Sequence, residues 1–242
     1  TRLRCDWSSD VCSSDLTFTF TSNIMRSNVQ TASNAIVINR TLRNTYQLLS
    51  ATLLFSGVMA YVSMAINFPY LGLMTLLGYF GLLFLVTKLR NSVYGILAVF
   101  ALTGFMGLTL GPIINMYLTA FSNGAELVAM AMTGTAVIFA TLSVYALVSQ
   151  KDFSFMGGFL AAGIMVMFLM GLAAYFFSMP ALSLAVSAGF ILLMSGLILY
   201  QTSTIIHGGE TNYIMATVTL YISIYNLFLS LLHILGFAAG DD

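Results

Sequence analysis

Seven long apolar stretches, separated by short polar segments, constrain this chain more than any other feature of its sequence. A helix needs about 20 apolar residues to cross the roughly 30 Å hydrocarbon layer of a bilayer. Stretches close to this length occur at residues 45–66, 70–87, 93–118, 127–149, 155–177, 181–203 and 213–237. The sequence therefore predicts an all-α polytopic membrane protein with seven transmembrane helices.

The composition supports this class and excludes others. Of the 242 residues, 59% are hydrophobic and only 7% are charged, whereas about a quarter of the residues in a soluble domain are charged. Eight basic and eight acidic residues give a net charge of zero, so the chain lacks the basic surface that binds nucleic acid. We expect membrane lipid as its surroundings and no nucleic-acid partner.

The first 16 residues differ from the rest of the chain. They contain both cysteines and the only tryptophan, and residue 1 is not methionine. We interpret residues 1–16 as a non-native tail translated from a sequencing adapter and exclude them from functional reasoning. Met25 is then the expected native start, residues 17–44 form a polar N-terminal tail, and residues 45–242 form the seven-helix transmembrane domain. No cysteine remains for a disulfide or a thiolate site.

The basic residues indicate the orientation in the membrane. Outside residues 1–16 they all precede the first span or follow the second and fourth spans: Arg26, Arg40, Arg43, Lys88, Arg90 and Lys151. Cytoplasmic loops of membrane proteins carry an excess of lysine and arginine. We therefore expect a cytoplasmic N-terminus, and an odd number of spans puts the C-terminus on the opposite side.

A stripe of polar residues follows one face of the predicted last span. Its members recur at steps of four and three residues: Thr219, Ser223, Asn226, Ser230 and His233. Such spacing puts side chains on one side of a helix. Because the bilayer core offers no water, these groups should face protein partners or a cavity, which predicts a helix at the centre of the bundle. The stripe either packs through interhelical hydrogen bonds or lines a narrow polar pathway.

Glycines at helical spacing mark the predicted third span. Gly104, Gly107 and Gly111 would let a neighbouring helix approach closely, and Pro112 removes a backbone donor and frees carbonyl groups that need a partner. We expect a kink at Gly111 and Pro112, either as part of the packing or as a hinge.

The expected cytoplasmic end of span six carries a short polar motif, His207, Gly208, Gly209 and Glu210. A metal site would need further strong ligands, and the neighbouring sequence has none. A turn capped by Thr211 or Asn212, with Glu210 near the helix start, is expected instead. The chain also lacks a zinc-binding histidine pair, a nucleophile turn and paired intramembrane aspartates. We therefore expect that the protein is not an enzyme, binds no cofactor, and has no catalytic or metal-binding residue.

Several motifs in the chain resemble the transmembrane Bax-inhibitor-motif family, and its bacterial YccA-like branch in particular. The strongest likeness lies in residues 200–213 and 220–228. Shorter matches in family order lie at residues 42–46, 103–105, 111–113, 151–155 and 235–238. The likeness runs from about Leu42 to the end of the chain.

The resemblance implies a fold and a function. The fold is a seven-helix bundle in which the other six helices surround the last one. The function is that of an inner-membrane protein, with its C-terminus in the periplasm, that associates with the membrane AAA protease FtsH. Such a protein is a slow substrate and restrains the protease. The candidate handle for FtsH is the tail of residues 25–44, with Met25, Arg26, Arg40 and Arg43.

The same family offers an alternative function, a pH-sensitive calcium or cation leak channel. Members described in this way use a pair of aspartates in spans six and seven, and the matching positions here are Gln201 and Ser223. Calcium prefers several anionic oxygen ligands, and a proton sensor needs a group that titrates. An amide and a hydroxyl supply neither, so a two-aspartate calcium gate is not expected here.

Overall fold

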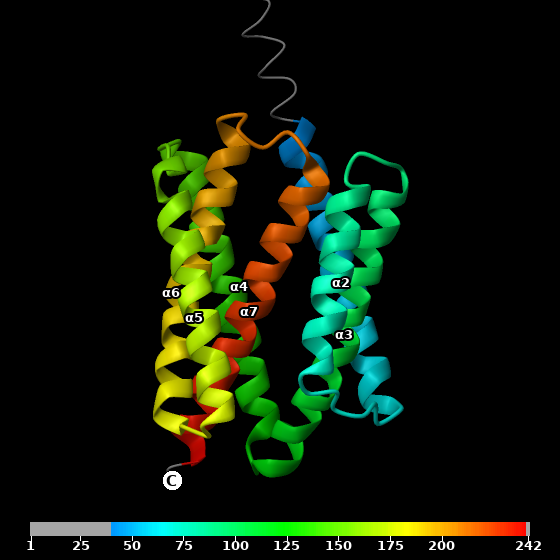
Figure 1. Ribbon diagram of the computed structural model, residues 1–242, viewed down its shortest axis with the longest axis vertical. Helices are drawn as coiled ribbons and strands as arrows, with labels where there is room; N and C mark the ends of the chain where they lie inside the picture. Colours follow the sequence, from blue (N-terminus) through cyan, green and yellow to red (C-terminus); the bar gives the residue numbers. More distant parts are fainter. Residues whose placement is uncertain (1–39, 241–242) are drawn as a thin grey trace, which may run out of the picture.

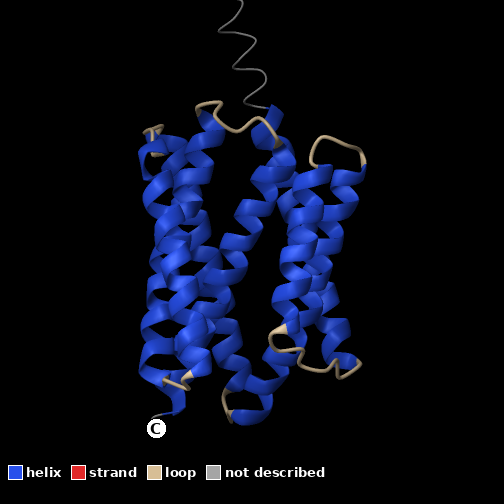
Figure 2. Cartoon of the chain, in the orientation of Figure 1, coloured by secondary structure: helices blue, strands red, loops and turns tan. Residues whose placement is uncertain are grey.

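The computed structural model describes residues 40–240, and all regular structure in this range is helical (Figure 2). The first helix covers Arg40–Ala65. It is followed by α2 (Met74–Leu89), α3 (Tyr94–Ala120), α4 (Gly124–Ser149), α5 (Gly157–Phe176), α6 (Pro180–Ile206) and α7 (Tyr213–Gly240), with a short 3-10 helix, η1 (Ser154–Met156), before α5. The predicted all-α class is confirmed, and the predicted spans coincide with these helices to within a few residues.

The count of seven spans is not confirmed. Six of the helices are long and apolar enough to cross a membrane, whereas α2 has only 16 residues, a length of about 24 Å at the helical rise. The span expected at residues 70–87 begins late because Gly72 has a φ of 54°, which no continuing α-helix accommodates. Hydropathy alone does not register this turn.

The start of the first helix also differs from the prediction. Residues 40–44, expected in the polar tail, are already helical. Thr41 and Thr45 are buried there, so this turn packs against the bundle although its composition is polar. The expected tail at residues 1–16, Met25 and Arg26 lie outside the described residues.

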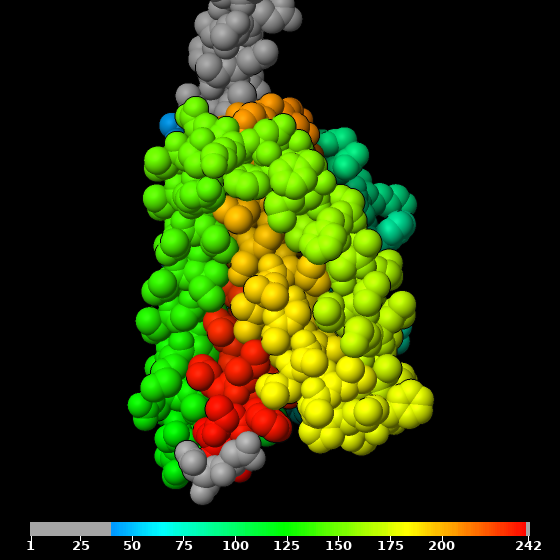
Figure 3. Space-filling view, turned by 90° about the vertical axis from the view of Figure 1, so that its left-hand side faces the viewer, coloured from blue at the N-terminus to red at the C-terminus, as the bar shows by residue number. Residues whose placement is uncertain are grey.

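The helices form an elongated bundle in which α7 passes between two groups (Figure 1). The helices α4, α5 and α6 lie on one side of α7, and α2 and α3 lie on the other. The first helix begins at the same end of the bundle as the α2–α3, α4–α5 and α6–α7 connections, and the C-terminus lies at the opposite end. In a space-filling view the C-terminal part of α7 reaches the surface between α4 and α6 (Figure 3).

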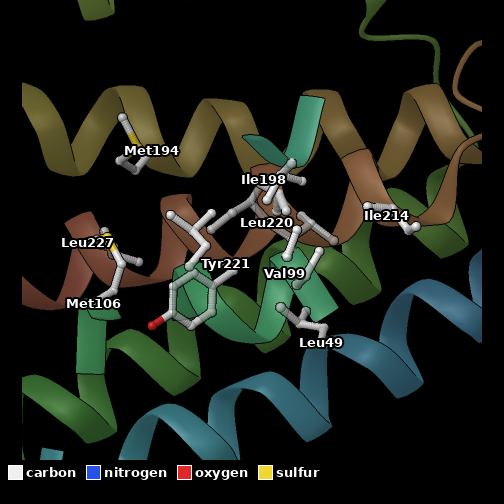
Figure 4. Packing of buried hydrophobic residues seen from close by; sticks show 13 residues of the cluster. Leu49, Val99, Met106, Met194, Ile198, Ile214, Leu220, Tyr221 and Leu227 are labelled. Carbon is white, nitrogen blue, oxygen red and sulfur yellow. The ribbon is translucent and has the colours of Figure 1, made fainter. Parts of the chain in front are cut away.

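The main buried cluster joins the first helix, α2, α3, α6 and α7 (Figure 4). Its members include Leu49, Val99, Met106, Met194, Ile198, Leu220, Tyr221 and Leu227. Large apolar side chains such as Phe84 and Phe159 are exposed instead on the outside of the bundle. In a membrane protein such residues face lipid, which needs no further burial.

Candidate functional site

The side chains in the first part of the predicted polar stripe form their hydrogen bonds with the backbone of α7 itself. The Thr219 hydroxyl donates to the Met215 carbonyl at 3.0 Å, and the Ser223 hydroxyl donates to the Thr219 carbonyl at 2.8 Å. The Asn226 amide nitrogen donates to the Ile222 carbonyl at 2.9 Å. These three residues lie on one helix, as their spacing predicts, but these bonds do not connect α7 to its neighbours.

The second part of the stripe lines a cavity. Asn226, Ser230 and His233 face a space of about 670 Å³ that α3 and α6 also line. The imidazole of His233 connects α7 to α6, since its Nδ1 lies 2.9 Å from the Ser187 hydroxyl and its Nε2 lies 3.4 Å from the Ser183 hydroxyl. The stripe therefore combines packing contacts with a cavity wall.

The positions that match the family's aspartate pair are both buried. Gln201 is 5% exposed and Ser223 is fully buried. The Ser223 hydroxyl is used by its own helix, and no hydrogen bond joins it to Gln201 within residues 40–240. Across the same residues there is no group of three or more histidine, cysteine or acidic side chains that could hold a metal ion. The side chains at these positions therefore give no support to a calcium site.

The α6–α7 connection forms the turn that the sequence predicts, with Asn212 as the cap. The Asn212 Oδ1 accepts hydrogen bonds from the Ile214 and Met215 backbone N–H groups at 3.0 and 3.3 Å. The Glu210 carboxylate accepts from the Asn212 N–H at 2.8 Å. The Asn212 amide also donates to the Arg90 carbonyl at 3.0 Å, so it ties the start of α7 to the α2–α3 connection.

The rest of this motif belongs to the same end of the bundle. Gly208 has a φ of 74°, a conformation that favours glycine, and the exposed His207 has its Nδ1 2.9 Å from the Ser203 carbonyl. In the neighbouring α4–α5 connection the Asp152 carboxylate accepts the Ser154 N–H at 2.8 Å. Hydrogen bonds from Ser154 hold the pKa of Asp152 below its usual range. These contacts order the turns and form no ligand set.

Gly111 and Pro112 lie where the first helix packs on α3. Pro112 is inside α3, which is helical from Tyr94 to Ala120, and it leaves the Leu108 carbonyl without its helical donor. The Ser63 hydroxyl from the first helix donates to this carbonyl at 2.6 Å. A Cβ atom on Gly111 would lie 2.5 Å from the Ser63 side chain, so the missing side chain allows this contact.

We predict that Ser63→Ala destabilises the protein. The substitution leaves the half-buried Leu108 carbonyl without a donor, which costs up to about 1–3 kcal/mol. Ser50→Ala is the matched control, because Ser50 is exposed on the same helix and bonds only to the nearby Gln47 carbonyl. Heating in mild detergent gives the apparent melting temperature of each variant. Equal temperatures for the two variants would show that the Ser63 hydrogen bond contributes nothing.

A second polar face of α7 was not singled out by the sequence. The Tyr221 hydroxyl lies 2.6 Å from the Ser56 hydroxyl of the first helix and donates to the Thr103 carbonyl of α3 at 3.3 Å. The contacts Thr217 to Thr45 and Tyr225 to Thr109 lie on either side of it. The recurrence of Thr217, Tyr221 and Tyr225 at every fourth residue was the available signal, and it is weak because tyrosines also serve as apolar core residues.

The similarity to known proteins extends over all the helices described above. A model of the family described as "Inhibitor of apoptosis-promoting Bax1" matches residues 38–240. The chain is 53% identical to the "Modulator of FtsH protease YccA" of Escherichia coli K12 over 204 residues, which are 84% of this chain and 92% of that protein. It is equally similar to the "Inner membrane protein YccA" of Escherichia coli O6:H1. An uncharacterized protein of Pseudomonas aeruginosa is 55% identical over 206 residues, 85% of this chain and 92% of that protein.

Proposed function

The chain belongs to the family described as inhibitor of apoptosis-promoting Bax1, and on this premise we propose that it is a non-enzymatic modulator of the membrane protease FtsH. The motif-based resemblance is thereby confirmed. The observation that carries the proposal is the 53% identity to an Escherichia coli protein whose name states this role, over 92% of that protein. Since the similarity covers nearly its full length, the two chains share a common architecture.

The proposed mechanism depends on resistance to extraction. A membrane AAA protease grips a tail and pulls the attached helices out of the bilayer, and the proposed handle here is the tail of residues 25–44. Arg40 and Arg43 at the end of this handle already belong to the first helix, so force on the tail acts on that helix first. A firmly held first helix would occupy the protease without being consumed quickly.

Three hydrogen bonds hold the first helix at different depths. Their pairs are Thr45 with Thr217, Ser56 with Tyr221, and Ser63 with Leu108. The first is the weakest, because the Thr217 hydroxyl shares its proton between the Thr45 carbonyl at 3.3 Å and the Tyr213 carbonyl of α7 at 2.7 Å. Thr45 and Ser63 are about 27 Å apart along the helix axis at the α-helical rise. The bonds are thus spread over most of a membrane span, and axial pulling strains them together. This arrangement supports the proposal that the bundle is a slow substrate.

The proposed topology puts the N-terminus in the cytoplasm and the C-terminus in the periplasm. Arg40, Arg43, Lys88, Arg90 and Lys151 belong to the end of the bundle where the first helix begins (Figure 1), as the positive-inside rule requires of a cytoplasmic face. In this proposal α2 crosses as a short seventh span, because a bilayer thins locally around a short helix. The first helix, α3, α4 and α6 contact α7, and the C-terminal part of α7 stays open at the surface between α4 and α6 (Figure 3).

The proposal is tested by co-purification and by substrate decay. A chain that starts at Met25 is purified with FtsH in mild detergent, and the decay of a separate FtsH membrane substrate is followed with and without it. Stable association together with slower decay is the expected result. Absence of association, with unchanged decay, would overturn the proposal.

We predict that deletion of residues 25–39 lengthens the half-life of the chain and removes its protection of the second substrate. The protease then lacks the segment that it grips, while Arg40 and Arg43 remain to fix the orientation. A Gly/Ser segment of the same length in place of residues 25–39 is the control for length alone. Pulse–chase measurements of both proteins in cells check this prediction. Unaltered decay of both would remove the handle from the mechanism.

A further inference from the structure

The cavity beside α7 has the size of a small-molecule site. Its volume is about 670 Å³, within the range of about 300–1,000 Å³ that ligand pockets occupy. It lies between the C-terminal part of α3, the first turns of α6 and the C-terminal half of α7. This is the end of the bundle away from the start of the first helix (Figure 1), so the proposed protease handle is not part of it.

The wall of the cavity is uncharged and of mixed polarity. Its polar members are Tyr117, Ser183, Ser187, Asn226, Ser230 and His233, besides a tyrosine at the rim. Apolar side chains such as Ile113, Met116 and Leu229 line the remainder. The lining contains no lysine, arginine or carboxylate. A ligand that carries a full charge would therefore lose its hydration without gaining an opposite charge.

Two hydroxyl groups in this wall have no partner. Ser230 is 8% exposed and Tyr117 is 7% exposed, yet neither hydroxyl makes a hydrogen bond within residues 40–240. The Ser223 hydroxyl on the same helix donates to a backbone carbonyl one turn earlier. The Ser230 hydroxyl does not make the corresponding bond. Neither oxygen atom is enclosed, because the buried polar atoms without a partner in this range belong to Thr45, Ser143 and Ser149. Both hydroxyls therefore reach the cavity, where a ligand could pair with them.

The cavity also presents acceptors. The Ser187 hydroxyl donates to the Ser183 carbonyl at 3.0 Å, so it accepts from the His233 Nδ1–H, and the Nε2 of the same ring accepts from the Ser183 hydroxyl at 3.4 Å. The Asn226 amide nitrogen is used by the Ile222 carbonyl, which leaves the Asn226 Oδ1 free. Donors and acceptors thus occur together in one apolar space.

We infer that this cavity binds an uncharged amphiphile with a hydroxyl-bearing head, of the monoacylglycerol class. Glycerol hydroxyls both donate and accept, so they can pair with Ser230 and Tyr117 as well as with Asn226. A quinone head only accepts and would leave the Asn226 Oδ1 unpaired, and a phosphate would find no cation. Tyr70 and Met116 at the rim are 69% and 58% exposed, which gives the acyl chain a way out toward lipid.

Photolabelling of the full chain tests the inference. The protein is embedded in nanodiscs and exposed to a monoacylglycerol that carries a diazirine in its acyl chain near the head, and the labelled residues are found by mass spectrometry. We expect labels on Ile113, Met116 and Leu229. Unlabelled monoacylglycerol should compete for them, whereas phosphatidylglycerol and a quinone should not.

A serine pair supplies the matched variants. Ser230→Ala removes a cavity donor and should weaken the apparent affinity about fivefold, the effect of one hydrogen bond. Ser143→Ala is the control, since Ser143 is a buried serine without a partner on α4 that does not line the cavity. Labels spread evenly over lipid-facing residues such as Leu77 and Leu97, without competition, would overturn the inference, and so would equal competition by phosphatidylglycerol or by the quinone. Equal effects of the two substitutions would also overturn it. None of these outcomes bears on association with FtsH.

Discussion

Gly107→Leu is expected to separate the first helix from α3 and to cause one of the largest losses of stability that a single substitution can cause here. A Cβ atom at Gly107 would overlap the Ser56 carbonyl oxygen. Backbone atoms cannot move aside as a side chain does, so the two helices must part. Overpacking costs about 1–3 kcal/mol and occasionally more, and we expect the upper end of this range because backbone atoms block the new side chain. The apparent melting temperature in mild detergent is the first measurement.

Gly57→Leu is the matched control for this substitution. Gly57 lies on the first helix, is exposed, and has nothing within 4 Å of the position that a Cβ would occupy. A leucine there faces lipid and should leave the melting temperature nearly unchanged. If Gly107→Leu and Gly57→Leu have the same apparent melting temperature, the close contact between the first helix and α3 is not needed for stability.

The same pair links stability to the proposed role. If slow extraction protects the chain, Gly107→Leu should shorten its half-life in cells with active FtsH but not in cells with an inactive protease. Gly57→Leu should decay as the parent chain does. A shortened half-life in both kinds of cell would show that loosening the bundle acts through other proteases.

The helices were predictable because a segment that crosses lipid must be apolar over its whole length, so the composition of a segment indicates a span directly. Spans expected at 93–118 and 213–237 appear as Tyr94–Ala120 and Tyr213–Gly240, since an uninterrupted apolar run must satisfy its backbone as a helix. The exceptions have local causes. The turn at Gly72 delays α2, and the buried threonines 41 and 45 extend the first helix into a polar segment. Neither is visible in average hydropathy.

The candidate site was predictable only in part. Periodicity correctly put Thr219, Ser223 and Ser230 on α7, but it does not show which carbonyl or cavity each hydroxyl faces, because rotamers decide this. The sequence also showed that Pro112 frees a carbonyl. It did not show that Ser63 supplies the donor, since that residue lies 45 positions from Leu108.

Tyr221→Ala is the second substitution for which we expect a large effect. Tyr221 is 1% exposed, and its ring belongs to the cluster that joins the first helix, α2, α3, α6 and α7 (Figure 4). Removal of a large buried ring costs about 3–5 kcal/mol. Tyr221→Phe keeps the ring and loses the bonds of the hydroxyl to Ser56 and to the Thr103 carbonyl, and one such bond in a membrane protein is worth about 0.6–2 kcal/mol. The melting temperatures should therefore fall in the order parent, Tyr221→Phe, Tyr221→Ala.

Tyr175→Ala and Ser56→Ala separate the two contributions of Tyr221. Tyr175 on α5 is 57% exposed, so its removal should cost far less than removal of Tyr221. The Thr103 carbonyl keeps its helical donor within α3, so the cost of Tyr221→Phe should come mainly from Ser56. Ser56→Ala combined with Tyr221→Phe should then cost less than the sum of the two. Strict additivity of the two stability losses would mean that the 2.6 Å contact between the Ser56 and Tyr221 hydroxyls contributes no energy. The ring of Tyr221 would then be the part of this side chain that holds the first helix against α7.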